Sequence, residues 1–182
     1  MRKSPSEQYS MLAILLHWVT AAVVFALFAV GYWMVDLNYY SEWYRTAPYW
    51  HKSVGLLLAL LTIARCLYKL QSSAPKPLGS KFEALAARSA HLMLYLLLFC
   101  LFISGYLIST ADGRGIDIFT WVTIPSAGEL FSDQEDIAGL VHEYVAYALM
   151  GLVAVHALAA LKHHFIDRDA TLRRMFKSQK LI

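Results

Sequence analysis

The chain has 182 residues, of which 58% are hydrophobic and 16% are charged, and its formal net charge is +3. Soluble domains contain about 45–50% apolar and about 25% charged residues. A water-soluble fold of this size could not bury so much apolar surface, because it still exposes about a third of the surface of its unfolded chain. The composition predicts one integral membrane domain over residues 1–182, and it argues against a soluble enzyme, a disordered tail and a disulfide scaffold.

Four apolar runs follow one another along the chain, each long enough to cross about 30 Å of hydrocarbon as a helix. They cover residues 11–35, 49–67, 89–111 and 137–161. The first run is too long for the core of a signal peptide and lacks a small-residue cleavage site, so we expect it to be the first span. The expected fold class is therefore all-α, a four-helix bundle in a membrane.

The charged residues indicate the direction of the spans. The N-terminal tail, the link 68–88 and the tail after Leu161, together with Arg65, hold 13 of the 16 Lys and Arg. The links 36–52 and 111–136 hold the other three, beside eight Asp and Glu. By the positive-inside rule we expect both termini in the cytoplasm and the acidic links outside, which in a bacterium is the periplasm. Anionic lipid explains basic clusters beside membrane ends, so they do not indicate nucleic acid binding.

The seven histidines are the most informative residues, because an ionisable side chain inside a membrane is costly and functional by default. The alternative for any single histidine is a hydrogen bond to a neighbouring helix. Depth in the membrane favours function: His17 and His156 are expected near the cytoplasmic face, whereas His51 and His142 are expected near the outer face. The four histidines thus form two pairs, one in each leaflet.

Spacing on the fourth span supports this interpretation. His142 and His156 are 14 residues apart, which is about 21 Å and close to four helical turns, so both point to nearly the same side of the helix. This arrangement suits two porphyrins at different depths, with His17 and His156 on the inner iron and His51 and His142 on the outer iron. Zinc fits less well, because ligands at two depths cannot converge on one tetrahedral ion.

Small residues flank these histidines where a flat ring would need room, although they also serve plain helix packing. They are Gly55, Gly139, Ala13, Ala21, Ala159 and Ala160. An iron held by two histidines has no open position, so it passes single electrons and does not activate oxygen. The chain is therefore expected to carry electrons across the bilayer.

Further polar residues are expected near the cytoplasmic ends of the spans. His91 has no partner at its depth and is expected to be an interfacial histidine. Lys162, His163 and His164 end the fourth span; His163 could accept a proton from quinol, or the three could be a basic stop at the headgroups. Arg65 follows His51 by 14 residues, and it could bind a propionate of the inner haem or extend to the headgroups.

These residues resemble the bacterial di-haem cytochrome b561 family. The matching segments cover nearly the whole chain: residues 15–18, 51–55, 90–95, 141–143, 155–157, 162–165 and 169–175. The resemblance implies a four-helix bundle in the bacterial inner membrane that exchanges electrons with ubiquinone. It also implies two b haems, with His17, His51, His142 and His156 as ligands and without His91. One branch of the family oxidises superoxide at the periplasmic face and reduces ubiquinone, and some relatives operate beside a lipocalin-like periplasmic isoprenoid-binding protein.

The acidic outer links bear on the redox partner. A negative field repels superoxide, unless Arg45, Lys52 or Arg114 makes a local positive site, and it suits a cationic or neutral partner at least as well. We expect a di-haem electron carrier between ubiquinone and a periplasmic one-electron partner, with superoxide:ubiquinone oxidoreductase activity as the most concrete candidate. Two alternatives stay open: the haem-bearing membrane anchor of a larger dehydrogenase or hydrogenase, and a haem-free protein whose histidines are only hydrogen-bonded.

Overall fold

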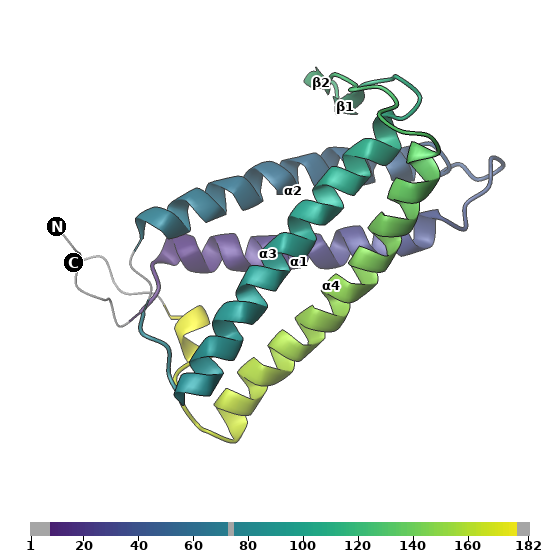
Figure 1. Ribbon diagram of the computed structural model, residues 1–182. Coiled ribbons are helices and arrows are strands. Elements are labelled where there is room, and N and C mark those ends of the chain that lie inside the picture. Colours follow the sequence, from purple (N-terminus) through teal and green to yellow (C-terminus); the bar gives the residue numbers. More distant parts are fainter. Residues whose placement is uncertain (1–7, 73–74, 178–182) are drawn as a thin grey trace.

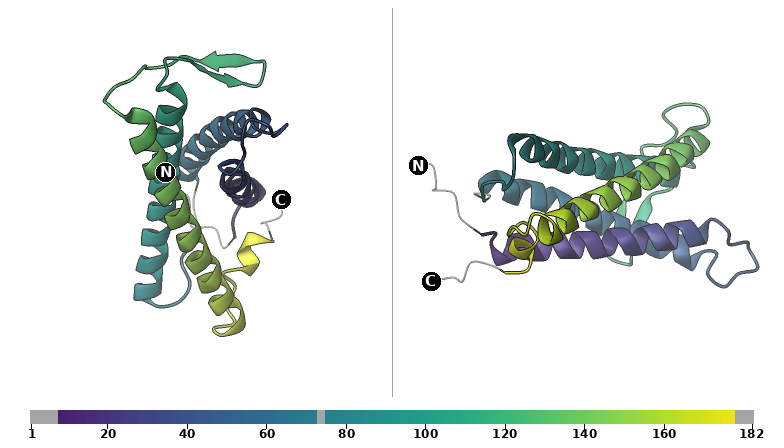
Figure 2. Two further views of the ribbon diagram at one scale, coloured as in Figure 1. Left: turned by 90° about the vertical axis from the view of Figure 1, so that its right-hand side faces the viewer. Right: turned by 90° about the horizontal axis from the view of Figure 1, so that it is seen from below.

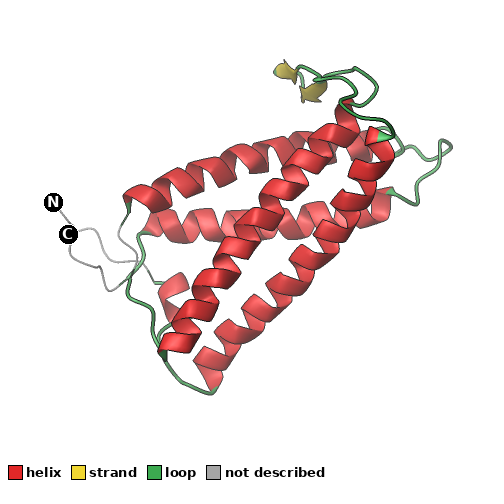
Figure 3. Cartoon of the chain, in the orientation of Figure 1, coloured by secondary structure: helices red, strands yellow, loops and turns green. Residues whose placement is uncertain are grey.

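The computed structural model describes residues 8–72 and 75–177, and four long helices dominate it (Figures 1 and 3). The helices are α1 (Met11–Met34), α2 (Thr46–Gln71), α3 (Lys81–Thr110) and α4 (Gln134–Phe165). A short hairpin of β1 (Ile116–Ile118) and β2 (Val122–Ile124) links α3 to α4, and the 3₁₀ helix η1 (Arg173–Met175) follows α4. All four long helices are long and apolar enough to cross a membrane. The expected all-α membrane bundle is confirmed.

Three of the helices, α2, α3 and α4, extend beyond the apolar runs. The helix α2 begins three residues before its run, and α3 begins eight residues before its run, at Lys81. The start of α3 is fixed by a capping box, in which the Ser80 hydroxyl accepts from the Glu83 amide and the Glu83 carboxylate accepts from the Ser80 amide. Hydropathy marks the hydrocarbon-crossing part of a helix, whereas caps decide where its hydrogen bonding begins, so the two limits differ.

The helices associate as two pairs, α1 with α2 and α3 with α4, with fewer contacts between the pairs (Figure 2). Many large apolar side chains point outward, as a lipid environment requires. The most buried side chains include small hydroxyls, with Ser53, Thr62 and Thr110 completely buried. Small residues let membrane helices approach closely, and here they lie inside the bundle.

The ends of the bundle differ in charge, and we name them accordingly. The basic end is where α1 and α3 begin and α2 and α4 end; the acidic end is the opposite one, with the hairpin and the link 35–45. At the basic end the segment after α4 folds back onto α1, because the Trp18 indole N–H donates to the Met175 carbonyl at 2.8 Å and its ring packs on Phe176. The tail therefore lies against the first turns of the bundle.

The hairpin at the acidic end was not predicted from the sequence, because its strands are only three residues long. Its buried face is formed by Ile116 and Ile118. Ser53 of α2 attaches it to the bundle: the hydroxyl donates to the Asp117 carbonyl at 3.1 Å and accepts from the Phe119 amide at 3.2 Å. The hairpin is thus held two residues along α2 from His51.

Candidate functional site

Two pairs of histidines lie inside the bundle, each contributed by two helices. His17 of α1 lies beside His156 of α4 with ring centroids 6.4 Å apart, and His51 of α2 lies beside His142 of α4 with centroids 6.3 Å apart. The structure thus brings together the same two pairs that depth in the membrane predicted. We call His17 and His156 the inner pair, and His51 and His142 the outer pair.

The ring separations fit two imidazoles on opposite sides of one metal ion. An imidazole nitrogen lies about 2.0 Å from a metal that it ligates. It lies about 1.1 Å from the centroid of its own ring, because the ring bonds are about 1.3 Å long. Two opposed ligands would therefore have centroids about 6.2 Å apart, close to the 6.3 and 6.4 Å observed. Direct hydrogen bonding between two rings would bring them closer than this.

Two glycines contact the histidines of the outer pair. A Cβ atom on Gly31 of α1 would lie 3.1 Å from Cε1 of His51, and one on Gly105 of α3 would lie 3.2 Å from Cε1 of His142. Each imidazole thus rests on a glycine that no larger residue could replace without a shift. At Gly55 and Gly139 a Cβ would meet no atom within 4 Å among the described residues. This open space beside the outer pair is compatible with a flat ring.

The Nδ1 atoms of the outer pair have different surroundings. Nδ1 of His142 lies 3.0 Å from the Ser104 hydroxyl, which is buried on α3. Nδ1 of His51 is buried and has no hydrogen-bond partner within the described part of the chain. A buried polar atom without a partner costs free energy. Hydrogen bonding within the described residues therefore does not by itself explain why these two histidines lie in the bundle.

The inner pair has a cation beside it. The Arg65 guanidinium lies 3.0 Å from Nδ1 of His17 and packs over the ring of Tyr95, 5.6 Å from its centroid. Arginine can only donate, so Nδ1 of His17 accepts here and the ring proton is on Nε2. A ligand needs a free lone pair on Nε2. His17 can therefore bind a metal through Nε2 only after Arg65 has moved to another acceptor.

His91 lies closer to the inner pair than expected. Its ring centroid is 5.2 Å from that of His156, so the prediction that it has no partner at its depth is wrong. The third span was expected to begin two residues before His91, but α3 begins at Lys81, so His91 lies within the helix and faces α4. The separation is about 1 Å too short for two ligands on opposite sides of one ion.

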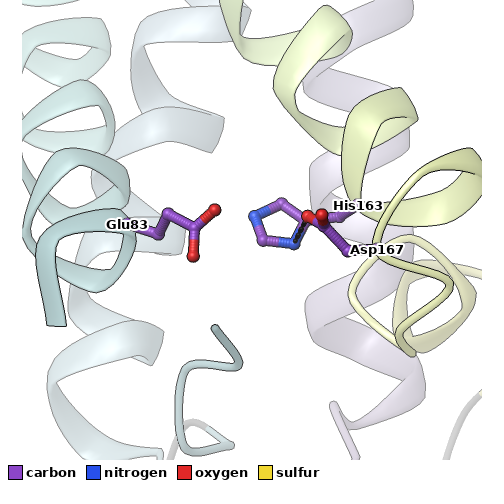
Figure 4. Close-up of side chains that lie close together, drawn as sticks. All are labelled: Glu83, His163 and Asp167. Carbon is purple, nitrogen blue, oxygen red and sulfur yellow. Dashed lines mark ion pairs between the residues drawn. The ribbon is translucent and has the colours of Figure 1, made fainter. Parts of the chain in front are cut away.

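His163 lies in a charged cluster at the basic end. Its Nδ1 is 2.8 Å from Asp169 and 3.1 Å from Asp167. Figure 4 shows His163 and Asp167 directed toward Glu83 of α3, and the ligating atoms of these three residues lie within 4.8 Å of one another. The Lys162 ammonium is 2.5 Å from Glu83 and 2.8 Å from Asp167. It already forms ion pairs with both carboxylates and so competes with a metal ion for them.

Asp169 and His164 complete this region. Burial alone would raise the pKa of the Asp169 carboxyl, but hydrogen bonds from Thr171 and His163 outweigh it and hold that pKa below its ordinary value. An ionised carboxylate on Nδ1 of His163 leaves Nε2 as the nitrogen that can exchange a proton. His164 instead packs against the Phe165 ring, and its buried Nδ1 has no hydrogen-bond partner among the described residues.

The acidic end presents mainly carboxylates. A surface hollow of about 550 Å³ close to His142 is lined by Ile108, Glu135, Asp136, Gly139, Leu140 and Glu143. Arg114, one of three cations expected there, forms an ion pair with Asp112 and holds the pKa of that carboxyl below its usual value. Its charge is therefore balanced locally and contributes little to a positive site.

A membrane bundle whose interior histidines stand in two pairs at the spacing of opposed metal ligands has the character of a b-type cytochrome. The family model described as "Prokaryotic cytochrome b561" matches residues 8–178. The chain belongs to the prokaryotic cytochrome b561 family. It is thus a bacterial membrane electron-transfer protein of a haem b-binding family, and the expected family is confirmed.

Several curated proteins are similar to the chain over nearly their whole length. "Cytochrome b561 homolog 2" of Escherichia coli K12 is 47% identical over 171 residues, covering 93% of this chain and 91% of the relative. "Cytochrome b561 homolog 1" of the same organism is 29% identical, covering 96% and 99%. "Probable superoxide oxidase CybB" of Yersinia pestis is 28% identical, covering 96% and 98%.

Proposed function

We propose that the chain carries electrons across the bacterial inner membrane between ubiquinone at its basic end and a one-electron partner at its acidic end. The observation that carries the proposal is the presence of two histidine pairs, with ring separations of 6.4 and 6.3 Å, at two depths along α4. The positive-inside rule assigns the basic end to the cytoplasm and the acidic end to the periplasm. The domain comprises residues 1–182.

Two b haems are the cofactors in this proposal, one for each histidine pair. The inner iron would be held by His17 and His156, and the outer iron by His51 and His142. Each haem supplies an iron that gains and loses one electron without an open coordination position. Arg65 would leave Nδ1 of His17 and pair with a propionate of the inner haem, because a carboxylate is a stronger acceptor for guanidinium than a neutral imidazole.

Ubiquinone would react at the basic end, with His163 as its proton donor and acceptor. Reducing a quinone to quinol takes up two electrons and two protons, so a titratable group must lie at the reacting oxygen. The Asp169 carboxylate, 2.8 Å from Nδ1, orients the His163 ring and leaves Nε2 for that exchange. His163 is only 14% exposed, which suits a site shared with the membrane phase.

Superoxide is one candidate for the partner at the acidic end. Two superoxide ions would each give up one electron and leave as oxygen, while one ubiquinone takes the two electrons and two protons. The similarity to the Yersinia relative, which is named as a probable superoxide oxidase, supports this reaction class. The local charge supports a second candidate, a cationic redox protein, because three carboxylates line the hollow close to His142.

The first test is the amount of haem b per polypeptide, measured by pyridine haemochrome on the purified protein. Two haems per chain are expected, and one or none would contradict the two-site arrangement. Ubiquinone reduction is then followed with superoxide as donor, and ubiquinol oxidation is followed with an oxidised basic cytochrome c as acceptor. Glu135→Gln and Glu143→Gln should slow the reaction with the basic cytochrome and leave or speed the reaction with superoxide.

The anchor-subunit alternative is tested in the same preparation. Co-purification of a stoichiometric soluble subunit, together with the absence of ubiquinone turnover by the chain alone, would replace the proposal with that function. Turnover by the isolated chain would exclude it.

A further inference from the structure

The residues Ser104 and Gly105 of α3 form one side of the outer site. Ser104 is 4% exposed, and its hydroxyl oxygen lies 3.0 Å from Nδ1 of His142. Gly105 is so close that a Cβ on it would lie 3.2 Å from Cε1 of the same ring. The helix α3 supplies none of the four histidines of the inner and outer pairs. In the described part of the chain, α3 meets the outer site at His142, through Ser104, Gly105 and the backbone of Leu101.

The neighbouring carbonyls favour one direction for the Ser104–His142 hydrogen bond. The hydroxyl has one hydrogen, and its oxygen lies 2.8 Å from the Cys100 carbonyl and 3.2 Å from the Leu101 carbonyl. Carbonyl oxygens only accept, so the hydroxyl hydrogen is directed to them. The Ser104 oxygen is then left to accept, and Nδ1 of His142 donates to it. The lone pair of that neutral imidazole is consequently on Nε2.

We propose that Ser104 is a positioning residue that prepares His142 to ligate the outer haem and tunes that haem. The inference rests on the proposed role of His142 as a ligand. The hydrogen bond holds the ring in the tautomer with a free Nε2, and it draws the Nδ1 proton away from the ring. The imidazole becomes a stronger donor to iron, which stabilises the ferric over the ferrous state and lowers the reduction potential.

Two of the other proposed ligands have different Nδ1 contacts. Nδ1 of His51 has no hydrogen-bond partner in the described residues, and Nδ1 of His17 faces the guanidinium of Arg65, which cannot accept. The effect of Ser104 should therefore be confined to the outer haem. A general effect of bundle packing would not distinguish between the two haems.

The test is a spectroelectrochemical titration of the haem-loaded protein, in which the potentials of both haems are measured. Ser104→Ala removes the acceptor and should raise the outer potential, by on the order of 59 mV if the ratio of ferric to ferrous stability falls tenfold. The inner potential should not change. Ser104→Thr keeps the hydroxyl and its bond to the preceding turn, so it should restore the original outer potential.

Thr110→Val is the matched control on the same helix. The Thr110 hydroxyl is completely buried and donates to the carbonyl four residues earlier, Tyr106, at 2.9 Å, and within the described residues it has no hydrogen bond to a histidine. Its removal should leave both potentials unchanged. An equal rise of the outer potential in Thr110→Val would assign the effect to helix packing and overturn the proposal.

The remaining outcomes also decide the question. Unchanged potentials in Ser104→Ala with both haems retained would overturn the role of Ser104, and so would an equal shift of both haems. Loss of the outer haem alone, restored by Ser104→Thr, would support it. If Ser104→Ala does not accumulate, Ser104→Cys replaces it, since a thiol is a weaker acceptor and should shift the potential in the same direction. Retention of the outer haem in His142→Ala would contradict the ligand assignment itself, which is a separate failure.

Discussion

The inner and outer histidine pairs have nearly the same ring separation, 6.4 and 6.3 Å, but opposite surroundings. The outer pair rests on two glycines and a buried hydroxyl, all of them uncharged. The inner pair has the Arg65 cation on one ring and the His91 ring against the other. The fold thus contains two histidine pairs with nearly the same ring separation and different electrostatic surroundings.

The different surroundings should shift the reduction potentials of the two proposed haems in opposite directions. A cation beside an iron centre favours the ferrous state, because reduction removes one positive charge from the site. A hydrogen bond accepted from a ligand imidazole favours the ferric state. In the proposed di-haem protein, both effects would place the reduction potential of the inner haem above that of the outer haem, so electrons would move from the acidic end to the basic end. The proposed reduction of ubiquinone at the basic end requires this direction.

The largest expected effect comes from removing one ligand of one pair. His51→Ala should abolish the outer haem and keep most of the inner one, and His17→Ala should do the reverse, because in each case one iron would lose one of its two proposed histidine ligands. Pyridine haemochrome and low-temperature optical spectra measure both. His91→Ala is the control and should retain both haems. Joint loss of both haems in either ligand variant would break the division into two independent pairs.

The next effect concerns His163, which belongs to the basic end alone. His163→Gln should slow ubiquinone turnover by at least about 100-fold, the lower range for a general acid–base group, with both haem spectra intact. Stopped-flow reduction of the haems by superoxide should be unaffected, because that step occurs at the other end. Unchanged quinone kinetics would remove His163 from the mechanism.

Much of this arrangement could be predicted from the sequence because it depends only on the position of each residue along its helix. Hydropathy located the four spans, and counting residues from the span ends gave the depths that pair His17 with His156 and His51 with His142. The contacts of Gly31, Ser104 and Gly105 were not predicted. They depend on how α1 and α3 are rotated about their own axes, and that rotation is set by packing against neighbouring helices.

The contacts of the inner pair likewise depend on packing between helices, which the sequence does not reveal. The interval of 14 residues from His51 correctly placed Arg65 near the basic end of α2, but its contact with His17 crosses from α2 to α1. His91 was misjudged for a related reason, since its distance to His156 follows from the close packing of α3 on α4. The hairpin was missed because three-residue strands leave no detectable period in the sequence.

Removing the Arg65 charge beside the inner pair tests whether electrostatics separates the two potentials. Arg65→Gln should lower the inner potential by on the order of 59 mV, one tenfold change in the ratio of ferric to ferrous stability, and leave the outer potential unchanged. Arg65→Lys keeps the charge and should cause a smaller shift. Arg88→Gln, at the start of α3, is the surface control. A rise of the inner potential would reverse the electrostatic argument.

The smallest effect is on stability at low pH and concerns Asp169 at the basic end. Its folded pKa lies below the ordinary value of 3.8, so its stabilising contribution is complete above that value and is lost as pH falls through the folded pKa. Asp169→Asn removes this contribution. The variant should melt at a lower temperature than the wild type near pH 6, and the difference should shrink toward about pH 3. Thermal unfolding followed by circular dichroism in detergent measures this difference.

A difference in melting temperature that widens on acidification would mean that Thr171 and His163 do not hold the Asp169 carboxylate ionised. The proposed orienting action of Asp169 on His163 would then lose its electrostatic basis.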